Sequence, residues 1–262
     1  MRKIGILLVA SIMAAGVLAS TAVAQVYTDP VGFVKVDLYK NGLTMISVPL
    51  TAADNRLNGD PGCIGDMIAE ACIGGMDGGQ ADVIWKWDAA SEAYTTPWLI
   101  DGWGGEYDGR WWDDNLGDYS NMMFDAGEAC WVMRRDTGAD VTTVTFLGWV
   151  PMADITTLTF VKGLTMFNWP YPTALVLNDS TLYQTALGGN DGGQADVVWE
   201  WDPVGKTYTT GWLIDGWGAP YDGKWWDDIA GDYSAIEFGP GKAFWFMRRP
   251  DEPCVWQCSR PY

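Results

Sequence analysis

The side chains best suited to chemistry are aspartates that stand among glycines and tryptophans in two similar stretches, residues 101–118 and 215–232. Hard cations such as Ca²⁺ take several carboxylate and carbonyl oxygens from a flexible loop, which closely spaced Asp and Gly supply. The spacing is not that of an EF-hand loop, and the alternative is that these aspartates cap turns and solvate the surface. Calcium is the only cofactor that we expect. Its candidate ligands are Asp101, Asp108, Asp113, Asp114, Asp118, Asp215, Asp222, Asp227, Asp228 and Asp232.

The chain contains no histidine, so it lacks the commonest general base, metal ligand and triad partner. No Gly-rich phosphate loop precedes a helical segment, and the cysteines do not have zinc spacing. Two carboxylates that face a cleft can hydrolyse glycosides. The acidic residues, however, recur in both stretches, whereas an active site need occur only once. We therefore expect a protein that is not an enzyme and has no catalytic residues.

Tryptophans recur in the same two regions. Exposed Trp rings would favour carbohydrate stacking or a protein interface, because ring faces make apolar and CH contacts. The alternative is that repeated aromatics form the core. The neighbours Trp111 and Trp112 must face opposite ways if they lie on a strand, so one ring of this pair would point outward. The repeated pairs are Trp85/Trp199, Trp87/Trp201, Trp98/Trp212, Trp103/Trp217, Trp111/Trp225, Trp112/Trp226 and Trp131/Trp245.

Five cysteines are present, and their spacing favours two local disulfides in an oxidising compartment. The expected pairs are Cys63–Cys72 and Cys254–Cys258, although connectivity cannot be deduced from sequence alone. Cys130 stands in an apolar run and is expected to be a free, buried and inert thiol, because burial without a basic neighbour raises a thiol pKa.

The N-terminus has the plan of a secretory signal peptide. Basic Arg2 and Lys3 precede an apolar run and an A-x-A site that ends at Ala24, and the run is short for a spanning helix. The alternative is a short N-terminal membrane anchor. Cleavage would leave 14 Lys and Arg against 34 Asp and Glu. Such a surface repels nucleic acid and anionic lipid and attracts cations, so we expect a secreted or cell-surface protein without nucleic-acid partners or membrane insertion.

An internal repeat organises the chain. Residues 77–135 recur at 191–249 with 38 of 59 positions identical and a constant offset of 114. This period is too long for a solenoid and indicates duplication of a domain. The match continues upstream, where Leu57-Asn58 answers Leu177-Asn178 at an offset of about 120. The first copy therefore has a few extra residues, near Cys63 and Cys72.

Within each copy the residues predict strands. Residues 82–87 are β-branched and aromatic and are followed by a turn at 88–91. Residues 34–38 and 43–48 flank Lys40-Asn41-Gly42 and predict a hairpin, and the apolar run 244–247 predicts a strand buried on both faces. Short helices are expected at 64–71 and 180–187.

We thus predict an all-β, mostly antiparallel fold of two tandem homologous domains, sandwich- or barrel-like, with one short helix each. The expected parts are a signal peptide (1–24), an N-terminal strand (25–40), a first domain (41–138), a linking strand (139–151) and a second domain (152–262).

Short motifs, most of them in the segments that flank the two copies of the repeat, resemble a family of uncharacterised exported bacterial β proteins. They are Asp29-Pro30-Val31-Gly32-Phe33, the segments 146–151, 163–166 and 170–172, and Gly241-Lys242-Ala243-Phe244-Trp245. The resemblance covers most of the mature chain and implies no activity and no catalytic residues. In general plan the chain is also similar to surface-fibre subunits that exchange an N-terminal strand.

The segments that flank the two copies also indicate how subunits could associate. Gly148-Trp149-Val150 resembles Gly32-Phe33-Val34, so the linking strand and the N-terminal strand look like one element. No such strand is evident after the second copy, and an open sheet edge invites a strand from another chain. We therefore expect a homopolymeric, head-to-tail extracellular filament, with Val26, Tyr27, Val31, Phe33 and Val34 at the subunit interface. The alternatives are that this strand folds back on its own first copy, and that the protein is a secreted carbohydrate-binding module with glycan partners.

Overall fold

The two copies of the repeat build mostly antiparallel β-structure. The computed structural model describes residues 29–125, 127–136 and 138–262; the expected signal peptide and the interface residues Val26 and Tyr27 lie outside them. Strands make up 42% of the structure and helix 6%, and none of the several sheets closes. The all-β prediction is confirmed, and the barrel alternative is wrong.

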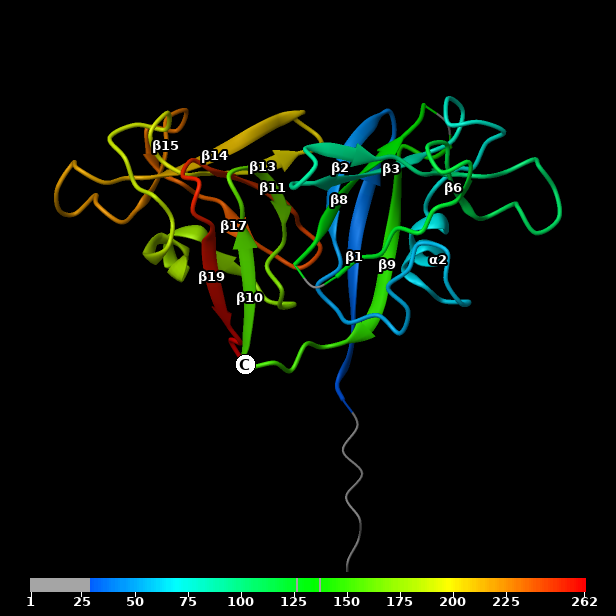
Figure 1. Ribbon diagram of the computed structural model, residues 1–262, viewed down its shortest axis with the longest axis horizontal. Coiled ribbons are helices and arrows are strands. Elements are labelled where there is room, and N and C mark those ends of the chain that lie inside the picture. The colour runs from blue at the N-terminus through cyan, green and yellow to red at the C-terminus, as the bar shows by residue number, and fades with distance from the viewer. Residues whose placement is uncertain (1–28, 126, 137) are drawn as a thin grey trace, which may run out of the picture. The chain divides into compact units, whose positions relative to one another are not determined.

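The first copy forms one antiparallel sheet (Figure 1). Its strand order is β2-β8-β3-β5-β6-β7, and β4 pairs with β3 beside this path. The turn predicted after residue 87 is confirmed, because Trp87 faces Tyr94 across the β3–β4 hairpin. The strands are β2 (Gly42–Ser47), β3 (Val83–Asp88), β4 (Ala93–Thr95), β5 (Trp98–Leu99), β6 (Trp111–Asp113), β7 (Asp118–Tyr119) and β8 (Ala129–Arg134).

The second copy repeats this sheet in the order β11-β18-β13-β14-β15-β16. Its β14 is continuous where the first copy has the separate strands β4 and β5. Pro97 interrupts the first copy because it has no N–H for the ladder, whereas Gly211 stands at the same place in the second. The strands are β11 (Gly163–Phe167), β13 (Val197–Asp202), β14 (Thr207–Leu213), β15 (Trp225–Asp227), β16 (Asp232–Tyr233) and β18 (Phe244–Arg248), with the small pair β12 (Leu175–Val176) and β17 (Glu237–Phe238).

Two long ribbons accompany these sheets (Figure 1). β1 (Val31–Tyr39) pairs with β9 (Val141–Trp149), and β10 (Ile155–Phe160) pairs with β19 (Cys254–Ser259). β1 therefore does not pair with β2, and the predicted hairpin is wrong. The turn at Asn41, with φ of 50°, instead leads the chain from the ribbon into the sheet.

The ribbons also correct the prediction that the second copy lacks a strand. The similar segments around Gly32 and Gly148 are cross-strand partners within one ribbon, not equivalent elements. By position in the repeat, β10 corresponds to β1 and β19 corresponds to β9. The Cys-containing tail is therefore the closing strand of the second copy, which removes the structural reason given for strand donation.

Each copy buries its own core between ribbon and sheet. Leu38 of β1 and Phe146 of β9 pack with Ile46, Ile84 and Val132 of the first sheet. In the second copy the corresponding core combines residues of β10, β19 and the sheet, among them Phe160, Trp256, Phe244 and Phe246. Within the run 244–247, residues 244–246 are buried on both faces as predicted, since Trp245 joins a third cluster that both copies share, and Met247 is partly buried. The N-terminal and linking strands thus belong to the first copy.

The described residues contain one α-helix, α2 (Ile64–Ala69), which agrees with the helix predicted at 64–71. The second copy has two 3₁₀ turns instead, η1 (Leu177–Asp179) and η2 (Thr181–Gln184). The Ser180 hydroxyl between them donates to the Leu177 carbonyl at 2.7 Å, a local bond that competes with helix formation. The short helix predicted at 180–187 is therefore present only as the 3₁₀ turn η2, not as an α-helix. No described helix has the length and apolar composition needed to cross a membrane.

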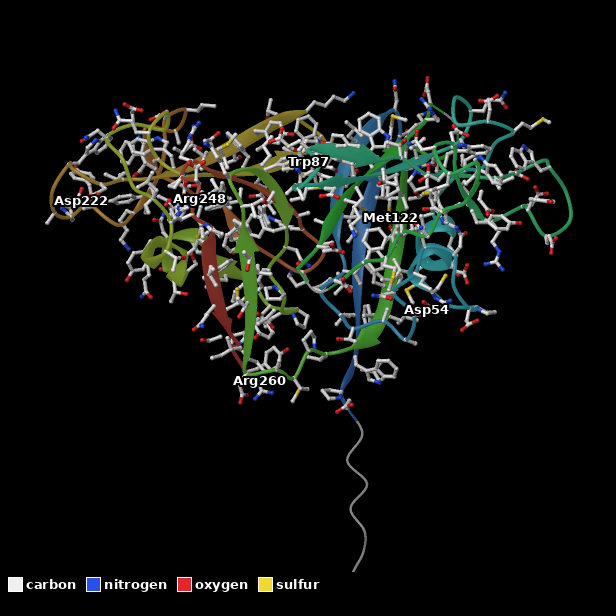
Figure 2. The ribbon with its side chains drawn as sticks, in the orientation of Figure 1. Asp54, Trp87, Met122, Asp222, Arg248 and Arg260 are labelled. Carbon is white, nitrogen blue, oxygen red and sulfur yellow. The ribbon has the colours of Figure 1, made fainter. Side chains whose placement is uncertain are left out.

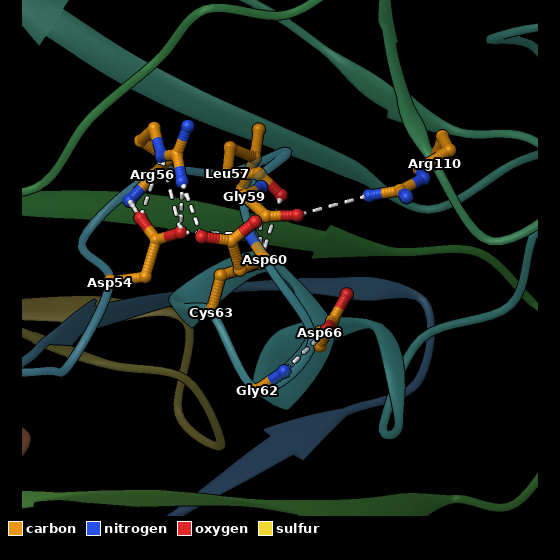
Figure 3. A network of polar contacts seen from close by, with 9 residues as sticks. All are labelled: Asp54, Arg56, Leu57, Gly59, Asp60, Gly62, Cys63, Asp66 and Arg110. Carbon is orange, nitrogen blue, oxygen red and sulfur yellow. Dashed lines mark hydrogen bonds and ion pairs between the residues drawn. The ribbon is translucent and has the colours of Figure 1, made fainter.

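A charged network fixes the turn at residues 54–60, where the segment with the extra residues of the first copy begins (Figure 3). Arg56 Nη2 lies 2.6 Å from Asp54 Oδ2, and the backbone N–H of Asp60 donates to the same oxygen at 2.8 Å. Arg110 donates to the Gly59 carbonyl at 3.3 Å. The Arg56 guanidinium holds the pKa of Asp54 well below its usual range, so the loop keeps this carboxylate charged.

All five cysteines are free, and both predicted disulfides are wrong. Cys254 and Cys258 lie on one strand, where four residues at about 3.3 Å each exceed the ~7 Å that a disulfide spans between Cα atoms. Cys63 and Cys72 are held apart by α2, which lies between them. The prediction for Cys130 is confirmed, because it is free and buried, and burial raises its pKa to about 12.

One asparagine in each copy secures the aromatic strand of the sheet. Asn58 donates to the carbonyls of Trp111 and Ser120 and accepts a hydrogen bond from the Trp111 N–H. Asn178 makes the corresponding three bonds in the second copy. The repeat of Leu-Asn upstream of the main duplicated block therefore has a structural cause.

Each copy also contains a buried ion pair. Asp196 Oδ2 lies 2.5 Å from Arg248 Nη1, and the carboxylate accepts the backbone N–H groups of Leu187 and Arg249, both at 2.8 Å. In the first copy Asp82 pairs with Arg134 at 3.5 Å and also accepts two backbone N–H groups. Arg248 is labelled in Figure 2, on β18.

Candidate functional site

The aspartates predicted to bind calcium mostly shape their own loops. Asp108 Oδ1 accepts the backbone N–H groups of Gly102, Trp103 and Gly104 at 3.0–3.1 Å. Asp222, on the loop between β14 and β15 (Figure 2), accepts the three corresponding groups at 2.9–3.0 Å. These carboxylates therefore serve as loop anchors.

The remaining aspartates do not converge on one point. Asp113 and Asp227 are buried and accept backbone N–H groups of their own turns. Asp118 and Asp232 each accept the N–H of the next tyrosine. Within residues 29–262, leaving out 126 and 137, no three or more His, Cys, Asp or Glu side chains are grouped so as to hold a metal ion. Calcium binding stays a prediction without a site. The other four candidates, Asp101, Asp114, Asp215 and Asp228, are exposed.

The same loops expose aromatic rings. Trp103 is 40% exposed and makes an edge contact with Trp112 at 5.0 Å between ring centroids. Its indole N–H donates to the Met76 carbonyl at 2.9 Å. As predicted, Trp111 is buried while its neighbour Trp112 is only partly so. Trp103 and Trp112 pack on one another and on the neighbouring tyrosines, and neither ring lines the cavities described below.

Two cavities do lie where the copies meet, and they are equivalent by the repeat. Cleft 1, of about 630 Å³, lies between residues 86–89 of the first copy and residues 157–160 and 165–167 of the second. Cleft 2, of about 450 Å³, lies between residues 35–37 and 44–45 of the first copy and 200–203 and 240–243 of the second. Both volumes fall in the range of small-molecule sites.

A turn from one copy enters the other at each cleft. Gly241, with φ of 79°, lies against Val36, and Gly127, with φ of 89°, lies against Leu158. The Ser47 N–H donates to the Gly241 carbonyl at 3.0 Å, and the Asn168 N–H donates to the Gly127 carbonyl at 3.1 Å. Glycine is needed at both turns, because a side chain would clash there and the positive φ is unfavourable for other residues.

Each cleft contains one ion pair, with opposite polarity in the two copies. In cleft 1 Lys86 Nζ lies 2.6 Å from Glu128 Oε2, and in cleft 2 Lys242 Nζ lies 2.6 Å from Glu200 Oε1. At an offset of 114, Lys86 corresponds to Glu200 and Glu128 corresponds to Lys242. The pairing is thus kept while its charges are exchanged, and it neutralises Lys86 and Lys242; Lys35, which also lines cleft 2, is not part of it.

The other polar lining residues are mostly threonines and aspartates beside a tryptophan, together with Asn121 in cleft 1 and Lys35 in cleft 2. Trp87 borders cleft 1 and Trp201 borders cleft 2, each followed by an exposed aspartate, Asp88 or Asp202. Thr44, only 5% exposed, lines cleft 2, and its hydroxyl has no hydrogen-bond partner. Thr165 lines cleft 1, and its hydroxyl is likewise buried without a partner, whereas Thr95 in cleft 1 and Thr209 in cleft 2 are half-buried. A buried polar group of this kind is costly unless something satisfies it.

The indoles of Trp87 and Trp201 also hold the copies together. Trp87 Nε1 donates to the Leu164 carbonyl and Trp201 Nε1 donates to the Leu43 carbonyl, each at 2.8 Å. Both tryptophans appear among the repeated pairs, but sequence reasoning did not place them between the copies. The charge exchange at 86/200 and 128/242 is a signal in the aligned repeats that could have located this joint.

Comparisons with protein-family models, with curated proteins and with solved structures found no match to this chain. The family resemblance noted above stays a prediction, and the function must be argued from the geometry.

Proposed function

We propose that this protein is an exported carbohydrate-binding protein without catalytic activity, which holds glycans in clefts 1 and 2. The observation that carries the proposal is the lining that the two equivalent clefts share, in which a tryptophan, a half-buried threonine (Thr95 or Thr209) and an exposed aspartate recur at the offset of 114. A sugar hydroxyl can donate to or accept from such a threonine hydroxyl.

The rest of the lining supports the same ligand class. The rings of Trp87 and Trp201 offer apolar edges for sugar CH groups, and Asp88 and Asp202 offer acceptors for sugar hydroxyls. The ion pairs of Lys86 and Lys242, together with the formal net charge of −18, leave little attraction for phosphate or nucleic acid. Because one chain contains two equivalent clefts, it would present two sites and gain avidity on a repeating polysaccharide. In this proposal each copy is a two-layer β domain.

Replacing Thr95 and Thr209 with valine tests this proposal. Valine keeps the shape and removes the hydroxyl, so binding of an array-selected oligosaccharide should weaken by about threefold to tenfold per cleft, the worth of one hydrogen bond. Thermal stability should be unchanged or slightly higher, because both residues lie on strands, where valine is favoured. Calorimetric titration and melting of the same samples would measure both.

The matched control is Thr145→Val, a strand position outside both clefts. It should bind like the native chain. Absence of binding to every glycan tested, or equal affinity of the double variant and the native chain, would contradict the proposal.

A second candidate, a self-assembling extracellular subunit, is favoured by one observation. Val31 faces Trp149 and Phe33 faces Leu147 at the end of the β1–β9 ribbon, and these side chains are 69%, 42%, 67% and 54% exposed. Val34, which was expected at the same interface, is 7% exposed and packs within its own chain. An exposed strip of this kind marks a contact surface.

If this strip joins subunits, the mature chain should self-associate with increasing concentration, and Phe33→Asp/Leu147→Lys should remain monomeric. Sedimentation velocity measures the difference. Ile229→Lys is the control, because Ile229 is 84% exposed and lies in the loop between β15 and β16. Monomeric behaviour of the native chain at every concentration would argue against the assembly function.

A further inference from the structure

A third cavity, distinct from clefts 1 and 2, has an almost wholly aromatic wall. Its volume is about 360 Å³, and it lies between the two copies. The first copy contributes Tyr94 and Trp131, and the second contributes Leu164, Trp199, Tyr208 and Trp245. Five of these six side chains are aromatic, and none is charged. We call this cavity the aromatic pocket.

The repeat places equivalent residues on both sides of the aromatic pocket. At the offset of 114, Tyr94 corresponds to Tyr208 and Trp131 corresponds to Trp245. The two tryptophans are 5% and 6% exposed, whereas the two tyrosines are 37% and 39% exposed. The tryptophans therefore form the inner wall, and the tyrosines stand at the entrance.

The rings are held in place before any ligand arrives. Trp131 makes an edge contact with Trp201 at 5.7 Å, and Trp245 makes one with Trp87 at 6.0 Å. Trp87 and Trp201 are themselves fixed by their hydrogen bonds to the opposite copy. Burial raises the pKa of Tyr94 and of Tyr208, so both phenols are neutral at physiological pH. A preorganised site loses little free energy in ordering its side chains.

This wall selects for a particular kind of ligand. Sugars need several hydrogen-bond partners, and the two tyrosine hydroxyls at the entrance are few for that purpose. A methylated ammonium ion needs none, because its methyl groups present apolar surface while its charge is attracted to aromatic faces. The chain carries a formal net charge of −18, which raises the local concentration of cations. We propose that the aromatic pocket binds the quaternary ammonium group of a choline-class ligand.

Isothermal titration of the mature protein with choline and with 3,3-dimethylbutan-1-ol tests this assignment. The alcohol has the same branched shape but no charge, so it should bind at least about tenfold more weakly if cation–π attraction dominates. Equal binding of the two probes, or no binding of choline, would overturn the proposal.

Variants at the entrance localise the binding. Tyr94→Leu and Tyr208→Leu should each weaken choline binding by about twofold to fivefold, the worth of one partly exposed ring, while Tyr94→Phe and Tyr208→Phe should retain it. Tyr107→Leu is the control, because Tyr107 is 42% exposed and lies in the loop between β5 and β6. An equal loss in the control would overturn the assignment to this pocket. Glycan binding should survive these changes, and choline binding should survive Thr95→Val/Thr209→Val, so failure of one proposal can be told apart from failure of the other. A glycan that displaces choline would show that the pocket is a sugar site.

Discussion

Replacing Asp196 with asparagine is expected to lower the free energy of unfolding by about 3–5 kcal/mol, the usual cost of breaking a buried ion pair. The Asp196 side chain is fully buried, and that of Arg248 is 8% exposed. Asparagine keeps the volume but leaves the guanidinium without a counter-charge. It also weakens the bonds to the N–H groups of Leu187 and Arg249. Urea unfolding followed by far-UV circular dichroism would measure the change.

A surface ion pair provides the comparison. Lys162 and Asp251 also approach to 2.6 Å, but their side chains are 61% and 82% exposed. Asp251→Asn should leave the midpoint of unfolding within error of the native value, because water screens such pairs. If both variants behaved alike, the buried pair would have no special structural role.

The strand pattern could be predicted from sequence because it is local. Residues 82–87 and 244–247 are β-branched and aromatic, and the turn at Asp88 follows from side-chain chemistry. The pairing of strands could not be predicted so well. β1 is adjacent in sequence to β2 yet pairs with β9, about a hundred residues later, because Leu38, Val144 and Phe146 share one core. A local alternation pattern contains no information about such distant partners.

The aspartate loops show why the sequence and the structure point to different candidate sites. Asp, Gly and Trp in close spacing fit both a calcium loop and a set of capped turns, and only geometry separates the two. Asp108 and Asp222 accept three backbone N–H groups each. The clefts and the aromatic pocket combine residues from both copies, so no contiguous motif marks them. Thr44 illustrates this, because it lines cleft 2 together with Trp201 and Lys242 of the other copy.

The joint between the copies should control the cooperativity of the whole chain. Met45, Trp131, Met166 and Trp245 form one buried cluster that belongs to both copies, and it is bordered by the reciprocal hydrogen bonds of Trp87 and Trp201. Two cores that share such a cluster should unfold together, whereas separate cores can unfold independently.

The double variant Trp87→Ala/Trp201→Ala is therefore expected to convert one calorimetric unfolding transition into two. It should also cost at least about 3 kcal/mol, since removing even one large aromatic side chain from a packed site costs that much. Trp103→Ala/Trp217→Ala removes the same number of indoles from the loops, where each donates a single bond to a nearby carbonyl of its own copy. That control should keep a single transition. If Trp87→Ala/Trp201→Ala also unfolded in one step at the melting temperature of the native chain, the copies would be coupled by something other than the shared cluster. The preorganisation argued for the aromatic pocket would then lose its basis.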